Sequence, residues 1–183
     1  MTARAFDPRS VDIAAFAKQG GGESGSVALI ALDRLCGEAH PEAKPAASES
    51  VEWRATGESR ARRGGAPEVW LHLEGRTQLS LVCQRCLQPV GTALHAQRGF
   101  QFVAGEDQAA AIDADSEDDV LALTRTLNLI ELLEDELLLV LPLVPLHDVC
   151  PRPLMVREDD SILEERINPF AVLGGLKRKS PSS

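Results

Sequence analysis

The sequence is poor in aromatic residues and in positive charge. Tyrosine is absent, and Phe, Trp and Tyr together make up 4% of the 183 residues. RNA-binding domains such as the RRM and the OB-fold stack bases on aromatic side chains, so this composition disfavours them. The 28 acidic residues outnumber the 19 lysines and arginines and give a formal net charge of −9. Diffuse electrostatic binding to nucleic acid is therefore disfavoured as well.

Long apolar runs are also missing. The longest, from Leu137 to Leu146, is interrupted by Pro142 and Pro145, and it is shorter than the ~20 apolar residues that span a bilayer. The start of the chain lacks the apolar core of a signal peptide. We therefore expect a cytoplasmic protein without a membrane segment. Its four cysteines should be reduced or metal-bound rather than paired in disulfides.

Motifs of the common enzyme classes are not found in the sequence. It has no Gly-rich phosphate loop, no Gly-x-Ser-x-Gly elbow and no His-Glu-x-x-His. The run Glu134, Asp135 and Glu136 could in principle serve acid–base chemistry. We interpret it instead as a solvated helix face, because runs of charge usually face water. The sequence favours a protein that binds a partner rather than an enzyme.

Helical signals dominate the first part of the chain. Asp7-Pro8 is typical of a helix start and predicts a helix that ends near Lys18. A second helix capped by Ser26 fits the spacing of the apolar residues that follow, although a strand over 27–32 fits them too. Those apolar residues are Leu29, Leu32, Leu35 and Cys36.

The middle of the chain has the two-residue period of β-strands. Strands are expected at 51–58, 68–74, 79–83, 90–103 and 120–123. Glu74-Gly75-Arg76 looks like the tight turn of an antiparallel hairpin. The acidic, alanine-rich stretch near 105–119 is expected to be a flexible loop, since it has few large apolar side chains.

The clearest helix begins at Asn128, which forms a capping box with Glu131, and it must end before Pro142. Together these elements predict an α+β fold. A mainly antiparallel sheet is accompanied by N-terminal helices, and one amphipathic helix packs on the sheet. We expect a single domain over 1–183 with a flexible C-terminal tail near 168–183.

Four residues have the spacing of metal ligands. Cys83 and Cys86 form a Cys-x-x-Cys pair, and His147 and Cys150 form a His-x-x-Cys pair. Together they would complete a structural four-ligand zinc site if the fold brought the two pairs together. The alternative is a set of reduced thiols that pack as small hydrophobic groups. The sequence leaves both interpretations open.

Two short basic clusters could contact phosphates. One consists of Arg60, Arg62 and Arg63, and the other of Lys177, Arg178 and Lys179. Phe170, in the apolar segment before the second cluster, could pack on the protein's own sheet or on a partner. An ordinary charged surface explains both clusters equally well.

Three segments, in this order, resemble the YceD family of bacterial large ribosomal RNA subunit accumulation proteins. They are LVCQRCLQP at 81–89, LLEDELLLVLPLVPLH at 132–147 and NPFAVL at 168–173, with LKRK following at 176–179. The resemblance implies a non-enzymatic role in the synthesis, processing or stability of 23S ribosomal RNA in a bacterial cytoplasm. It implies no catalytic residue.

The resemblance leaves the partner open. The chain could contact 23S rRNA or its precursor directly through the two basic clusters. It could instead bind a ribosomal protein or an assembly factor, which acid-to-base complementarity favours. A different hypothesis is a zinc-stabilised protein-interaction module unrelated to ribosomes. The least supported is a nuclease that uses the acidic helix face, because no nuclease motif is found in the sequence.

Overall fold

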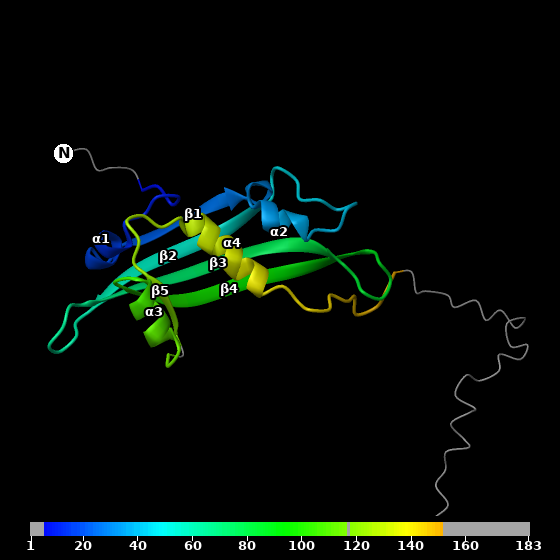
Figure 1. Cartoon of the computed structure of the whole chain (residues 1–183). Helices are drawn as coiled ribbons and strands as arrows, with labels where there is room; N and C mark the ends of the chain where they lie inside the picture. Colours follow the sequence, from blue (N-terminus) through cyan, green and yellow to red (C-terminus); the bar gives the residue numbers. More distant parts are fainter. Residues whose placement is uncertain (1–5, 117, 152–183) are drawn as a thin grey trace, which may run out of the picture. The chain divides into compact units, whose positions relative to one another are not determined.

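A computed structural model describes residues 6–116 and 118–151 of the chain (Figure 1). Five strands form one sheet in the order β1-β2-β3-β4-β5. The first four pair antiparallel with their neighbours, whereas β5 runs parallel to β4. The strands are β1 (Gly22–Ala28), β2 (Ser50–Arg60), β3 (Glu68–Val82), β4 (Pro89–Val103) and β5 (Asp119–Ala122). The predicted α+β class with a mainly antiparallel sheet is confirmed.

Four α-helices and one short 3-10 helix accompany the sheet in the described residues. They are α1 (Ile13–Lys18), η1 (Leu29–Ala31), α2 (Asp33–Gly37), α3 (Glu106–Asp113) and α4 (Leu129–Leu139). Figure 1 shows α4 lying across β3 and β4, and contacts join it to both strands. The longest of these helices, α4, has 11 residues, and no described helix is long and apolar enough to cross a membrane.

The core lies between the helices and one face of the sheet. Alternate residues of β2 and β3, such as Val51, Leu71 and Leu73, are buried, as the two-residue period predicts. From α4, Leu133 and Leu137 are fully buried among them. Burying each such side chain contributes roughly 1.5–3 kcal/mol, so this single layer of helix on sheet holds the fold together.

The turn predicted at Glu74-Gly75-Arg76 is wrong, because β3 continues through it as one long strand. Gly75 pairs with Trp53 on one side and with Ala96 on the other. A Cβ atom at Gly75 would meet the side chain of Leu133. The glycine is therefore needed for the close approach of α4 to the sheet, and not for a change of chain direction.

The N-terminal helices also differ from the prediction. Asp12 rather than Asp7 caps α1, accepting the Ala15 amide at 2.9 Å, while Asp7 stabilises a turn before it. The end of α1 at Lys18 is as predicted. Ser26 lies in β1, and the apolar residues with helical spacing are divided between η1 and α2. Short helices joined by an irregular residue preserve this spacing, so periodicity alone does not separate them from one helix.

The acidic stretch near 105–119 is not irregular throughout. Residues Glu106–Asp113 form α3, which packs on β5 and buries Ala109. The Asp113 carboxylate accepts the Val120 amide at 3.1 Å and ties the helix to the strand. Alanine is the strongest helix former, and acidic residues in the first turn favour a helix start. The flexibility of this stretch stays a prediction, and the tail near 168–183 lies outside the described residues.

Candidate metal centre and charged surfaces

The Cys-x-x-Cys pair occupies the turn between β3 and β4. The Cys83 amide donates to the Gln88 carbonyl at 3.0 Å, and the Leu87 amide donates to the Cys83 carbonyl at 2.9 Å. Leu87 completes the turn with a left-handed backbone, at φ 57°. Both thiols are buried. The turn thus fixes the positions of two sulfur atoms at one end of the sheet.

The His-x-x-Cys pair reaches the same place from the other side of the fold. After α4 ends, the chain runs to the end of the sheet where β3 turns into β4 (Figure 1). The Gln84 amide donates to the Pro145 carbonyl at 2.9 Å, which attaches this segment to the turn. The ligand atoms of Cys83, Cys86, His147 and Cys150 all lie within 4.8 Å of one another. The structure therefore brings together all four residues of the candidate metal site.

The His147 ring is oriented as a metal ligand would be. Its Nε2 lies 3.0 Å from the Pro89 carbonyl, and its Nδ1 lies 3.4 Å from the Cys86 sulfur. A carbonyl can only accept, so Nε2 donates to Pro89, and Nδ1 faces the sulfur cluster, where it would offer its lone pair to a bound metal ion. Metal-bound histidines commonly donate their other N–H to a backbone carbonyl in this way.

The cluster favours a thiolate at one cysteine. Burial opposes ionisation of Cys83, but the backbone amides of Cys86, His147 and Arg85 and the His147 side chain stabilise its thiolate and lower its pKa to about 5. Burial and the neighbouring sulfurs of Cys86 and Cys83 raise the pKa of Cys150. A cation between the sulfurs would remove the repulsion that raises the pKa of Cys150.

The donor set fits zinc. Tetrahedral zinc with three sulfurs and one imidazole nitrogen is a common structural site. Zn–S bonds of about 2.3 Å place tetrahedral sulfurs roughly 3.8 Å apart, so the 4.8 Å spread of the four ligand atoms needs only a small contraction. With zinc held by four protein ligands no position would stay open for a substrate, so the donor set fits a structural rather than a catalytic site.

The acidic run on α4 is not the solvated face that the sequence suggested. Glu134 and Glu136 are buried, and Asp135 is half-buried. Glu134 accepts the amides of Arg34 and Leu35 at 2.9 and 3.1 Å, and its second oxygen binds the Arg34 guanidinium at 3.0 Å. Its role is to hold the start of α2 against α4.

Glu136 is the second buried carboxylate, and it binds Arg98 at 3.2 Å. Burial raises its pKa, and the charge of Arg98 partly opposes that rise. Helical spacing could have revealed both carboxylates. Glu134 lies four residues after buried Ile130, and Glu136 lies three residues after buried Leu133. The solvated-face prediction is therefore wrong for these two residues.

The first basic cluster lies on the β2–β3 connection. Residues 61–67 are all exposed, including Arg62 and Arg63. Arg60 is engaged within the protein: its guanidinium lies 4.2 Å from the Trp70 ring centre and binds Glu58 at 2.9 Å. The second cluster, Lys177, Arg178 and Lys179, lies outside the described residues, as does Phe170.

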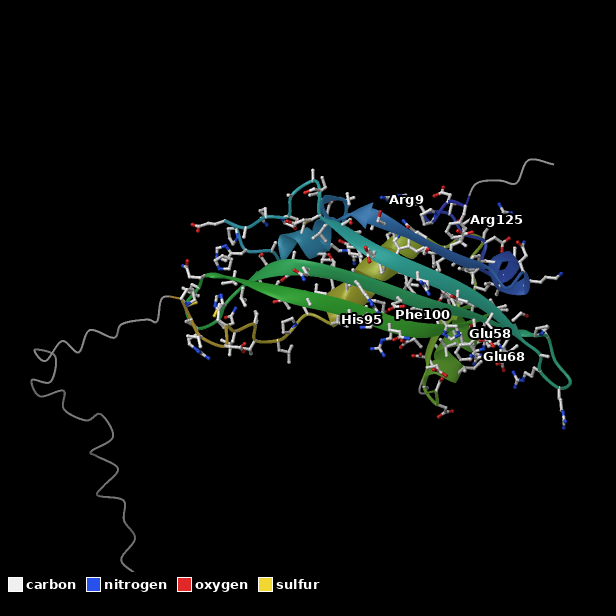
Figure 2. All side chains as sticks on the ribbon, turned by 180° about the vertical axis from the view of Figure 1, so that it is seen from behind. Arg9, Glu58, Glu68, His95, Phe100 and Arg125 are labelled. Carbon is white, nitrogen blue, oxygen red and sulfur yellow. The ribbon has the colours of Figure 1, made fainter. Side chains whose placement is uncertain are left out.

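Figure 2 views the sheet from the face opposite α4, where Glu58, Glu68 and His95 are labelled. Two carboxylates on this face each bind one arginine and one histidine. Glu58 pairs with Arg60 and His72, and Glu74 pairs with Arg76 and His95. These partners lower the pKa of both carboxyl groups. The face is therefore a balanced set of charges and not a positive surface.

Known proteins identify the family. The sequence model of the YceD family, described as large ribosomal RNA subunit accumulation protein YceD, matches residues 71–177. The chain belongs to the YceD family. A YceD protein of Haemophilus influenzae with that description is 34% identical over 120 residues, which cover 62% of this chain and 69% of the relative. No solved structure matches the chain. The YceD match includes the four clustered ligands and α4, and it excludes Arg60, Arg62 and Arg63.

Proposed function

We propose that this YceD-family chain supports the synthesis, processing or stability of 23S ribosomal RNA during large-subunit biogenesis. The observation that carries the proposal is the family match over residues 71–177, which spans the cysteine–histidine cluster and α4. The relative from Haemophilus influenzae is described as a large ribosomal RNA subunit accumulation protein. A zinc-stabilised module without a tie to ribosomes is not favoured, because a zinc site and the ribosomal role are compatible in one protein.

The chain acts by binding rather than by catalysis. The two buried carboxylates of α4, which a nuclease would use to hold magnesium, are engaged within the protein. Glu134 accepts hydrogen bonds from α2, and Glu136 binds Arg98. The histidines of the open sheet face, His72 and His95, each bind a carboxylate at the surface. This use of the charged residues supports an interaction protein. The ribosomal description of the relative supports a place in the cytoplasm.

Zinc is the ion that fits the cluster, and we infer that Cys83, Cys86, His147 and Cys150 hold it. The ion would join the β3–β4 turn to the segment that follows α4. Bound there, it would stabilise the end of the sheet and fix the course of that segment, and it would supply no catalytic step. Purified protein is expected to contain close to one zinc per chain, and less than about 0.2 would exclude a structural site.

The proposed partner is 23S rRNA or its precursor, reached directly or through a protein. Direct contact would use Arg62 and Arg63 of the β2–β3 connection together with Lys177, Arg178 and Lys179. The net charge of −9 limits such contact to these local clusters. A basic ribosomal protein or assembly factor would instead be attracted by the acidic surface as a whole.

Crosslinking in living cells tests this proposal. The tagged chain is crosslinked and purified under denaturing conditions, and the RNA and proteins bound to it are identified. We expect 23S precursor sequences, or a protein of the large-subunit assembly path, to be enriched over a tag-only control. Charge reversal of Arg62 and Arg63 should lower RNA crosslinking if contact is direct and leave it unchanged if it is not. RNA and protein profiles identical to those of the control would contradict the proposed function.

A further inference from the structure

Five exposed apolar residues lie in the two segments that carry the cluster. Leu143 is 99% exposed, Val149 85% and Leu87 60%, and Val144 and Leu146 are exposed as well. We call these five residues the knuckle patch. Three of them adjoin a cluster residue: Leu87 follows Cys86, Leu146 precedes His147 and Val149 precedes Cys150. Leu143 and Val144 lie four and three residues before His147. Soluble monomers rarely expose apolar groups together in this way, and such patches mark interaction sites.

The backbone at Leu87 is a second, independent observation. Among the described residues it is the one non-glycine with positive φ. Glycine adopts this conformation without steric cost, and a leucine does not. The side chain gains little core packing in return, since the residue is 60% exposed. A strained residue whose side chain is exposed is typical of a functional position.

The patch is held on a rigid support. The Leu87 carbonyl accepts a hydrogen bond from His40 Nε2 at 3.1 Å, while His40 Nδ1 accepts the Glu42 amide. Pro142 and Pro145 restrict the segment after α4, and the Gln84 amide attaches it to the β3–β4 turn. Apolar groups presented in a fixed arrangement lose little conformational entropy on binding, which is the property of an interface anchor.

We propose that the knuckle patch docks a segment of another protein whose apolar side chains are flanked by basic residues. This inference rests on the proposed function and names the kind of partner, a basic protein of large-subunit assembly. RNA is not favoured here, because the five side chains offer phosphates neither a cation nor a hydrogen bond. A second copy is not favoured either, since it would bring a charge of −9 against −9. A basic partner gains both from the apolar contact and from the charge.

Site-specific photocrosslinking tests the surface. A photoreactive amino acid replaces Leu143 in the full-length, zinc-loaded chain in living cells, and a second strain carries it at Ile30. Ile30 is the matched control, since it is an exposed apolar residue, 48% accessible, in η1. We expect position 143, and not position 30, to crosslink to one basic protein. Crosslinks to rRNA, to another copy of the chain, or to nothing would each overturn the proposal.

Substitutions separate docking from stability. Leu87→Gly removes the exposed side chain and the strained backbone together, so its melting temperature and zinc content should equal or exceed those of the wild type. Its crosslinking yield at position 143 should nevertheless fall at least tenfold, as should that of Val149→Ser, whereas Ile30→Ser should have no effect. Unchanged yields in Leu87→Gly and Val149→Ser would overturn the proposal.

The same strains separate this inference from the proposed function. Complementation is scored by the ratio of 23S to 16S rRNA after depletion of the chromosomal protein. If depletion changes the ratio and Leu87→Gly restores it as well as the wild type, the docking surface is wrong and the ribosomal role stands. If depletion leaves the ratio unchanged while position 143 still captures one basic protein, the surface stands and the ribosomal role fails.

Discussion

Removing zinc should lower the stability of the fold by an amount that follows from the position of the cluster. The contact between Cys86 and His147 joins residues 61 positions apart. A crosslink that closes a loop of this length removes unfolded-state entropy worth about 4 kcal/mol, by analogy with a disulfide. For a domain of this size that corresponds to a fall of roughly 10 °C in melting temperature. Stabilities of folded domains are about 5–15 kcal/mol, so the metal-free chain should still fold.

Thermal unfolding followed by circular dichroism checks this value, with zinc present and after chelation under reducing conditions. Cys86→Ser should reproduce the effect of chelation and make the protein insensitive to added zinc. Cys36→Ser is the matched control, because Cys36 lies outside the cluster and donates to the Leu29 carbonyl, a bond that serine can keep. A chelator effect below about 2 °C, or equal losses in Cys86→Ser and Cys36→Ser, would show that zinc at the cluster does not stabilise the fold.

Three further results are expected. In metal-free protein the pKa of the Cys83 thiol is lowered from 9.0 to about 5, so its thiolate stabilises the fold fully above pH 9 and loses this effect as the pH falls to 5. The difference in melting temperature between wild type and Cys83→Ser should therefore shrink as the pH is lowered from 9 to 5. A difference that stays constant with pH would contradict this prediction. Glu134→Ala should cost about 2 kcal/mol in urea unfolding, because the buried amide of Leu35 and the part-buried amide of Arg34 lose their acceptor. Exposed Glu23→Ala should cost less than about 0.5 kcal/mol. Gly57→Ala should lower the free energy of unfolding by about 1–3 kcal/mol, because its Cβ would lie 2.8 Å from the α1 backbone. Gly91→Ala, with open space around the added Cβ, should leave the free energy of unfolding unchanged. Equal effects of the two substitutions would contradict this packing.

The ligand set could be predicted from the sequence, but its assembly could not. The spacing of Cys83 and Cys86, and of His147 and Cys150, is local information. Their convergence depends on the long strand β4 and on the path of the chain through α4, which local spacing does not contain. The extended segment after α4 was predictable from its prolines. Its hydrogen bond to the β3–β4 turn was not.

The wrong predictions have one physical cause, which is that tertiary packing decided the role of the residue. Gly75 between two charged residues has the composition of a turn, yet it is the close contact of Leu133 that requires the glycine. Glu134 and Glu136 look like members of a charged face, yet their partners Arg34 and Arg98 come from distant elements. In each case the sequence specifies the residue type, while the reason for it lies across the core.

The role in the accumulation of the large ribosomal RNA is tested by the ratio of 23S to 16S rRNA after depletion of this protein. We expect the ratio to fall as the protein disappears and to recover when the wild-type chain is supplied. Recovery should be poor with Cys86→Ser at the growth temperature and full with Cys36→Ser. A ratio that stays unchanged throughout depletion would contradict a role in the accumulation of the large ribosomal RNA.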